Sequence, residues 1–324
     1  MIVAKFFVLL GIITGASYLL SKGAESFSER FGKNFTGSII LALITTLPEY
    51  MFVIFASLKG EYQVAFGSAI GSCSLLTTLG YGMVILLATS KLSKQPVRFI
   101  ELSKETGIDA VYLFTTAFVA LLLSWEEKGL DVKDGIILTI LFAGYIYQIT
   151  RQAIAHISER SQQEKSSLEK QEFLKGLLYL FVGGIIIIAA SEPFVDSMIK
   201  FATLIKISPV VIAIILGPLA SEMPEKITAY ITVLRNGSLA EISICNFIGS
   251  KVNHNSLLLA LIPFIAAGKG HGQIYNAVTP SFVLMFCLTL FATASLARRK
   301  LEKWQGFVFT GLYIFMLVFT FATH

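Results

Sequence analysis

The sequence predicts an all-α polytopic membrane protein, with ten transmembrane helices in two inverted five-helix repeats and broken helices at the midplane. Composition is the first observation behind this fold class: 55% of the 324 residues are hydrophobic and 15% are charged, whereas soluble domains average about 25% charged residues. The second is that apolar runs long enough to cross a bilayer, about 17–25 residues each, recur along the whole chain. The third is a pair of short motifs that returns once in each half. The recurrence of apolar runs excludes a cleaved signal peptide with a soluble protein behind it.

The apolar runs of the first half predict five spans, at 3–21, 34–58, 62–90, 108–124 and 133–151. Polar and charged clusters separate them, the clearest being SKLSKQPVRFIELSKETG after the third span and EEKGLDVKD after the fourth. We therefore expect a first five-helix repeat at 1–150, with its motifs in the region of about 34–90. The polar residues 151–172 that follow are too few for a domain, and we expect them to form a cytoplasmic linker.

The second half predicts spans at 173–191, 207–234, 239–267, 276–296 and 304–322, which form a second repeat at 173–324 with its motifs at about 207–267. Because five is an odd number, the second half enters the membrane with the opposite orientation. Lys and Arg are more frequent in the loops that lie inside when the N-terminus is outside, so we expect both termini outside. The same loops account for the net charge of +5 without a nucleic-acid partner.

Two motifs recur at matching positions in the second and third spans of each half. Segment 45–50 reads TTLPEY and segment 221–226 reads SEMPEK, while SAIGSC at 68–73 corresponds to NFIGSK at 246–251. The Pro-Glu dipeptide recurs 176 residues further along the chain and Ile-Gly-Ser recurs after 178 residues, so the two motifs keep almost the same spacing in both halves. Inverted repeats whose helices are interrupted near the midplane are typical of secondary transporters, so the pattern favours transport.

The Pro-Glu motif places cation-binding chemistry at a helix break. Pro48 and Pro224 each remove a backbone N–H and free a carbonyl of the preceding turn. Glu49 and Glu225 stand beside the breaks, and hydroxyls are supplied by Thr45, Thr46 and Ser221. Oxygens of these kinds are the ligands that Ca²⁺ binds, 6–8 at a time. The simpler interpretation is a kinked helix with a buried hydrogen-bonded glutamate, but a charged residue at midplane costs about 2.5–3.5 kcal/mol and two copies carry that cost twice.

The Gly-Ser motif supplies the facing helix. Gly67, Gly71 and Gly249 let helices approach closely, and further oxygens come from Ser68, Ser72, Asn246 and Ser250. Small residues at this spacing also serve helix packing alone. Their pairing with the Pro-Glu helices is what favours a contribution to an ion site.

TTLPE with GSAIGSC, and SEMPE with CNFIGSK, resemble the two α-repeats of the cation/calcium exchanger superfamily, in particular those of prokaryotic sodium/calcium exchangers, which run near G-T-S-L-P-E and G-N-x-I-G-S-N. The resemblance implies an antiporter that moves Ca²⁺ against Na⁺ or H⁺ by alternating access. It would be a monomer in a prokaryotic inner membrane, with no enzymatic activity and no cofactor. Glu49 and Glu225 would be the central carboxylates. The oxygen ligands beside them would be Thr45, Ser72, Ser221 and Ser250.

The second repeat departs from that pattern. Glu222 stands where the family has a hydroxyl, and Lys251 directly follows Gly-Ser. Four residues after each Gly-Ser serine, where such exchangers usually carry Asn or Asp, the chain has Leu76 and His254. We hypothesise that Glu222, Lys251 and His254 form a titratable cluster that shifts coupling toward H⁺. In the alternative, Lys226 and Lys251 snorkel to an interface, and Glu222 with Lys226 forms a structural pair one helical turn apart.

Other functions remain open at this point. The altered ligands would also suit proton-coupled transport of Mg²⁺ or Mn²⁺. An intramembrane enzyme could use Glu222, Glu225 and His254, but it has little need of a second Pro-Glu element at Glu49, and HExxH, Walker A and GxGxxG motifs are absent. A sensor without transport activity is the remaining alternative, because Leu76 and Lys251 weaken the ligand set.

Overall fold

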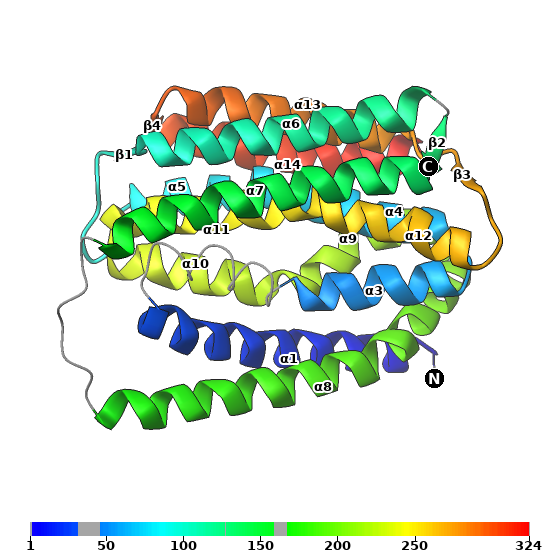
Figure 1. Cartoon of the computed structure of the whole chain (residues 1–324), viewed down its shortest axis with the longest axis horizontal. Coiled ribbons are helices and arrows are strands. Elements are labelled where there is room, and N and C mark those ends of the chain that lie inside the picture. The colour runs from blue at the N-terminus through cyan, green and yellow to red at the C-terminus, as the bar shows by residue number, and fades with distance from the viewer. Residues whose placement is uncertain (1, 32–45, 127, 159–166, 324) are drawn as a thin grey trace.

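Helices that run along one common axis make up nearly all of the computed structural model, which describes residues 2–31, 46–126, 128–158 and 167–323 (Figure 1). The first half contains α1 (Ile2–Phe31), α3 (Leu47–Leu58), α4 (Tyr62–Leu75), a π-helical turn (Leu76–Gly80), α5 (Tyr81–Ala88), β1 (Phe99–Glu101), α6 (Lys104–Glu126), β2 (Gly129–Asp131) and α7 (Val132–Ser158).

The second half contains α8 (Ser167–Leu204), α9 (Pro209–Ser221), α10 (Met223–Arg235), a 3₁₀ turn (Gly237–Leu239), α11 (Ala240–Asn253), a second π-helical turn (His254–Leu258), α12 (Leu259–Gly268), β3 (Gln273–Tyr275), α13 (Pro280–Ala297), β4 (Lys300–Glu302) and α14 (Lys303–Thr323). The linker expected at 151–172 is partly helical, because α7 continues to Ser158 and α8 begins at Ser167. Of the predicted span 34–58, residues 34–45 lie outside the described part of the chain.

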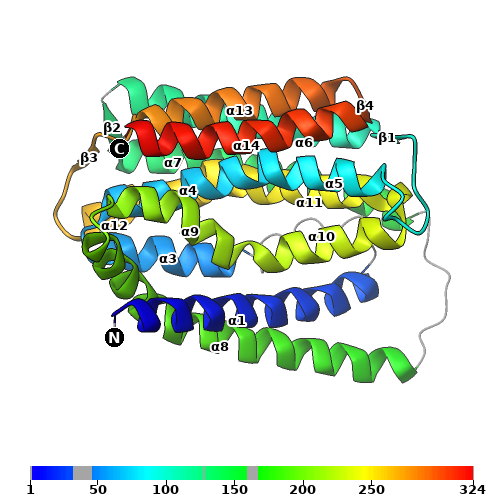
Figure 2. The ribbon, with the colours of Figure 1, turned by 180° about the vertical axis from the view of Figure 1, so that it is seen from behind.

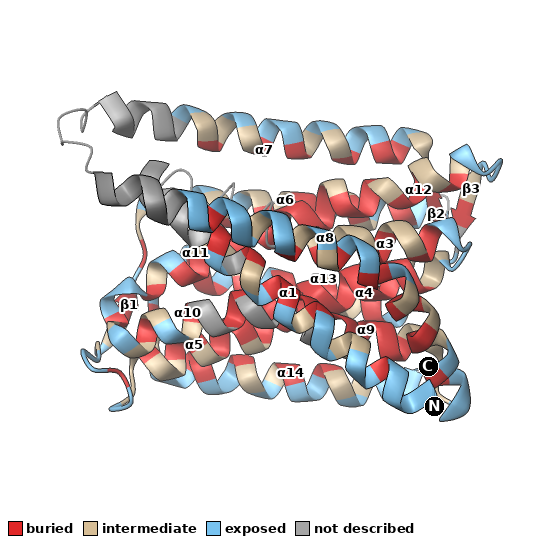
Figure 3. Ribbon diagram, turned by 90° about the horizontal axis from the view of Figure 1, so that it is seen from below, coloured by how far each residue is buried: buried red, intermediate tan, exposed pale blue. Residues whose placement is uncertain are grey.

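Length and hydropathy identify the chain as an integral membrane protein. Among the described residues, seven helical stretches are long and apolar enough to cross a membrane: Ile2–Leu20, Tyr62–Ala88, Thr106–Glu126, Val132–Arg151, Leu174–Leu204, Pro280–Ala297 and Lys303–Thr323. Large apolar side chains on the outer helices are exposed, among them Phe181 at 67%, Phe307 at 61% and Val318 at 63%. Buried residues gather on the central helices, and the outer faces of α7 and α8 are exposed (Figure 3). The outward apolar surface therefore suits contact with lipid.

The helices are stacked in successive layers, seen from two sides in Figures 1 and 2. On one side α1 packs along α8, where Phe6 stacks on Phe194 and Phe201 with ring centroids 5.7 and 4.7 Å apart. α3, α9 and α10 lie next to this pair, followed by α4, α5, α11 and α12. α6, α7, α13 and α14 cover the far side. The polar motifs predicted from the sequence fall in the central layers, away from lipid.

A close helix crossing joins the two halves at Gly71. A Cβ at this position of α4 would collide with the backbone of Ile214 in α9. Only glycine allows the two helices to approach this far. The Gly-Ser helix of the first half therefore lies directly against the broken helix of the second half.

Two small antiparallel ribbons join the halves at opposite ends of the molecule (Figure 1). In β1–β4, Ile100 pairs with Leu301, and in β2–β3, Leu130 pairs with Ile274. All four of these apolar side chains are buried. In each ribbon one strand precedes the 151–172 segment and the other follows it. The ribbons therefore tie loops of the two halves together at both ends.

The Pro-Glu motifs begin helices in both halves. Pro48 and Pro224 lie in the first turns of α3 and α10, where a missing N–H costs nothing because the first N–H groups of a helix have no intrahelical partner. α9 ends at Ser221, and Glu222 occupies the junction before α10. The predicted break in 207–234 is thus confirmed. The carbonyl expected to be freed by Pro48, that of Ile44, lies outside the described residues.

Candidate cation-binding site

Buried carboxylates gather where the broken helices begin. Glu49 lies in the first turn of α3, Glu222 at the α9–α10 junction and Glu225 in the first turn of α10, with exposures of 2%, 2% and 4%. From near the middle of the molecule, α3 and α10 run toward opposite ends (Figure 1). The partial positive charge of a helix N-terminus favours a carboxylate in its first turn. Both halves therefore direct a helix N-terminus and a glutamate into the centre of the protein.

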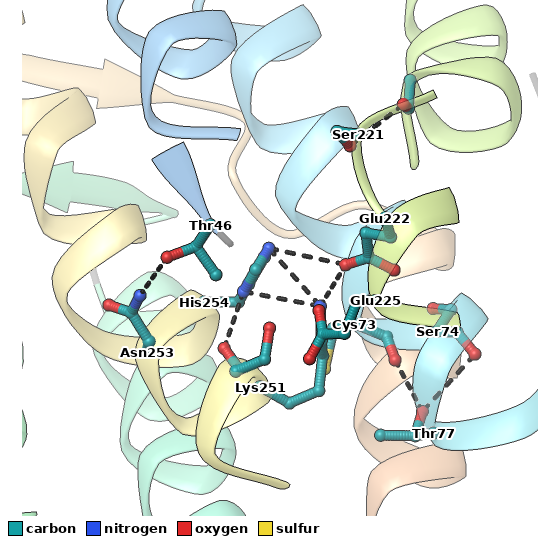
Figure 4. Close-up of polar contacts among 12 residues, drawn as sticks. Thr46, Cys73, Ser74, Thr77, Ser221, Glu222, Glu225, Lys251, Asn253 and His254 are labelled. Carbon is teal, nitrogen blue, oxygen red and sulfur yellow. Dashed lines mark hydrogen bonds and ion pairs between the residues drawn. The ribbon is translucent and has the colours of Figure 1, made fainter. Parts of the chain in front are cut away.

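Lys251, from α11, reaches into this cluster. Its Nζ forms an ion pair with Oε1 of Glu222, and the two side chains are 0% and 1% exposed. The same Nζ lies 3.4 Å from each ring nitrogen of His254 (Figure 4). A charge without water is tolerated when it is paired, and Glu222 provides that pairing. The alternative in which Lys251 snorkels to an interface is therefore wrong, and Lys226 is buried as well, at 2% exposure.

His254 is held in one orientation by the backbone. Its Nδ1 lies 2.7 Å from the carbonyl oxygen of Ser250. Because a carbonyl only accepts, Nδ1 carries the hydrogen and donates it. In the neutral ring Nε2 is then an acceptor, and it lies 3.7 Å from Oε1 of Glu222. The lone pair of His254 is therefore available inside the carboxylate cluster.

One ligand atom each from Glu49, Glu222 and His254 lie within 4.8 Å of one another, and all three residues are buried. Both carboxylate oxygens of Glu49 and Oε2 of Glu222 have no hydrogen-bond partner among the described residues. An ionised carboxylate buried without a partner is strongly destabilised. This trio therefore requires a cation or a proton, and it can hold a metal ion.

The hydroxyls predicted as ligands surround this cluster in different ways. Ser72 and Ser250 are fully buried, and within the described chain their Oγ atoms have no hydrogen-bond partner. Ser221 donates to the carbonyl of Gly217 at 3.1 Å, and together with Ser68 it lines a small pocket beside Pro48. Thr45 lies outside the described residues.

A polar network joins α3 and the residue before it to α11, and two of its members, Tyr50 and Asn253, were missed by sequence reasoning. The hydroxyl of Tyr50 donates to Oδ1 of Asn253 at 2.5 Å, and Nδ2 of Asn253 donates to Oγ1 of Thr46 at 3.1 Å. Asn246, which was predicted as a ligand, donates to Oε1 of Glu225 at 2.9 Å. Tyr50 and Asn253 are polar residues inside apolar spans, directly beside the two motifs, and this position could have identified them as members of the site.

A membrane helix bundle around a buried cluster of carboxylates belongs to the class of ion-transporting membrane proteins. The chain itself is a member of the sodium/calcium exchanger protein family, whose family model matches residues 1–151 and 175–322. The resemblance drawn from the two motifs is thereby confirmed. Members of this family are transporters, so the chain is not assigned to the enzymes.

Relatives and solved structures agree with the family assignment. An uncharacterized membrane protein of Methanocaldococcus jannaschii is 28% identical over 318 residues, 95% of each chain. A putative antiporter, CaxA, of Alkalimonas amylolytica is 31% identical over 146 residues, 43% of this chain and 42% of the relative. The structure of the H⁺/Ca²⁺ exchanger CAX superposes with a TM-score of 0.80 at 22% identity, covering 98% of this chain and 82% of the other. That of the sodium-calcium exchanger NCX_Mj gives 0.69 at 23%, covering 98% and 99%. The chain therefore has the exchanger fold.

Proposed function

We propose that the protein is a secondary antiporter that exchanges Ca²⁺ for a monovalent cation by alternating access, and that this counter-ion is H⁺ rather than Na⁺. The observation that carries the proposal is the cluster of Glu49, Glu222 and Glu225 at the starts of broken helices, away from lipid. The names of the related proteins, an H⁺/Ca²⁺ exchanger and a sodium-calcium exchanger among them, support the same class of transport. The protein works as a monomer in the inner membrane of a prokaryote, with both termini outside, and needs no cofactor.

The architecture of the proposal is ten transmembrane helices in two inverted repeats, 1–150 and 173–324, joined by a cytoplasmic linker at 151–172. Three local features support it. A π-helical turn follows the Gly-Ser motif in each half, at Leu76–Gly80 and at His254–Leu258. A proline and a glutamate open both α3 and α10. The ribbons pair β1 with β4 and β2 with β3, as a two-fold relation between the halves requires.

Coupling follows from the need to neutralise the carboxylates before the site turns to the other side of the membrane. The Lys251 ammonium already compensates Glu222. Glu49 has no hydrogen-bond donor among the described residues, so its charge must be cancelled by the transported cation or by a proton. Ca²⁺ bound on one side and protons bound on the other both meet this requirement. A site whose carboxylates are not neutralised does not reorient across the membrane, which prevents uncoupled movement of ions.

H⁺ is favoured over Na⁺ because this site has lost oxygen ligands and gained titratable groups. Leu76 offers no ligand atom, and His254 offers a nitrogen where the family's pattern has an amide or carboxylate oxygen. The Lys251 ammonium places a positive charge among the remaining oxygens, which opposes the binding of additional Na⁺. The residues that would release protons when the cation binds, and take them up when it leaves, are Glu222, Lys251 and His254.

Ca²⁺ flux into proteoliposomes, with Na⁺ and pH gradients imposed independently, tests the proposal. We expect uptake to follow the pH gradient in the absence of Na⁺. Uptake that survives collapse of the pH gradient and disappears without Na⁺ would show that proton coupling is wrong. Absence of flux under either gradient would overturn antiport altogether.

Two glutamate variants test the site itself. Glu49→Gln and Glu225→Gln should each abolish flux, because each half contributes the carboxylate of its own Pro-Glu motif. Glu61→Gln, at an exposed turn before α4, is the matched control and should transport normally. Flux that persists in Glu49→Gln would contradict a site shared between the two halves.

A further inference from the structure

The orientation of His254 is that of a metal ligand. In metal sites the ring nitrogen that does not bind the ion typically donates to a backbone carbonyl or carboxylate, which fixes the tautomer and the ring plane. Here Nδ1 donates to the carbonyl of Ser250 at 2.7 Å. Nε2, the other nitrogen, faces Glu222 in a fully buried environment.

We infer that the site, besides Ca²⁺, takes a divalent first-row transition-metal ion such as Mn²⁺ and binds it more tightly, through Nε2 of His254 and one carboxylate oxygen each from Glu49 and Glu222. This inference rests on the proposed function, since it names a second cargo of the same site. Two carboxylates and one imidazole are a mixed oxygen and nitrogen set, which suits transition metals. Ca²⁺ is bound by 6–8 oxygens, and an imidazole supplies none.

The distances suit an ion of this size. Ligand atoms at about 2.0–2.2 Å from a metal lie roughly 3–4 Å from one another. One ligand atom from each of Glu49, Glu222 and His254 already lies within 4.8 Å of the other two, so only small side-chain shifts separate this arrangement from a coordinated ion.

Unsatisfied polar atoms point to the same ligand. Both oxygens of Glu49 and Oε2 of Glu222 lack a hydrogen-bond partner among the residues described. Burial leaves them no water, so an ion between them and His254 would supply the missing interaction. The hydroxyls of Ser72 and Ser250, buried and equally without a partner in the described chain, are available for further coordination.

Lys251 and the metal ion are alternative occupants of this space. Its Nζ is bound to Oε1 of Glu222 and lies 3.4 Å from Nε2 of His254, the two groups that the ion would use. A divalent cation and an ammonium this close repel each other, so Lys251 must withdraw when the ion enters. The Lys251 ammonium thus competes with the metal ion for Glu222 and His254. Lys226 is also buried, in the first turn of α10, and its positive charge adds to the repulsion of the ion.

Binding of the metal alone to the purified full-length protein tests the inference. Mn²⁺ is followed by loss of the EPR signal of the free ion, and Ca²⁺ by its competition with Mn²⁺. Wild type should bind Mn²⁺ about 10-fold or more tightly than Ca²⁺. His254→Asn, which replaces the nitrogen ligand with an oxygen, should lose about 10-fold or more in Mn²⁺ affinity while Ca²⁺ affinity holds or rises. His271→Asn, in an exposed loop, is the matched control and should change neither.

Lys251→Met provides a second test that does not alter any proposed ligand. Removing the competing ammonium should tighten Mn²⁺ binding. The inference is overturned if wild type shows no preference for Mn²⁺, if His254→Asn leaves the ratio of the two affinities unchanged, or if Lys251→Met weakens binding of Mn²⁺. Ca²⁺ flux driven by the pH gradient without a Mn²⁺ preference would refute this inference alone. Selective Mn²⁺ binding without any Ca²⁺ flux would refute the proposed function alone.

Discussion

Replacing Lys251 with methionine should strongly destabilise the protein, because it leaves Glu222 buried without its cation. The two side chains are 0% and 1% exposed, so neither can turn to water when the other is removed. Breaking such a buried pair by deleting one partner costs about 3–5 kcal/mol. Replacing both partners with neutral groups of similar size is often close to neutral. We therefore expect Lys251→Met to lose about 3–5 kcal/mol of unfolding free energy, and Lys251→Met with Glu222→Gln to recover most of that loss.

Unfolding in mixed micelles with increasing SDS measures these free energies. Lys59→Met is the matched control, because Lys59 pairs with Glu192 and Asp196 at 3.1 and 3.0 Å but is 27% exposed. That change should cost about 1 kcal/mol or less. A divalent cation at about 100 times its dissociation constant should restore roughly 2.7 kcal/mol to Lys251→Met, since the ion replaces the lost charge. If Lys251→Met is as stable as wild type, or if the two substitutions act additively, the pairing described here does not hold Glu222.

Three further outcomes follow from contacts outside the ion pair. Tyr50→Phe removes a hydroxyl that donates to α11 and should cost about 0.5–1.5 kcal/mol in the same unfolding assay, whereas an unchanged stability would show that the bond contributes nothing. Gly71→Leu forces a side chain against the backbone of Ile214 and should cost about 3 kcal/mol or more, with poor recovery of folded protein on size-exclusion chromatography. Ile100→Cys with Leu301→Cys, in a cysteine-free background, should form a disulfide across the β1–β4 ribbon and leave Ca²⁺ flux intact; loss of flux on oxidation would show that the ribbon opens during transport.

The helices were largely predictable because lipid imposes length and hydropathy on each span. The break at Glu222 was predictable too, since a proline in the next turn cannot continue the same hydrogen-bond ladder. The end of α8 could not be predicted in the same way, because the sequence indicates a span that ends at 191, whereas the helix continues to Leu204. Glu192 and Asp196 resemble the start of a polar loop, but they remain in the helix and pair with Lys59.

Which side chains meet at the site could be predicted only in part. The motifs identified Glu49, Glu222 and Lys251 as candidates, but not that Lys251 binds Glu222 rather than reaching an interface. Tyr50 and Asn253 are 203 residues apart in sequence, so no local pattern connects them. The short strands were missed for the same reason, because a three-residue segment in a loop acquires its pairing from a partner far along the chain.

The β1–β4 ribbon can form only late in the synthesis of the chain. Phe99 pairs with Glu302, so β1 leaves the ribosome about 200 residues before its partner exists. At about 5–20 residues per second, synthesis of that interval takes roughly 10–40 s. Throughout this time an inserted first half presents an open strand edge with Ile100 uncovered, a hazard for mispairing that the insertion machinery must shield. A nascent chain that terminates before Lys300 never forms β4, so the edge of β1 stays open in a truncated protein.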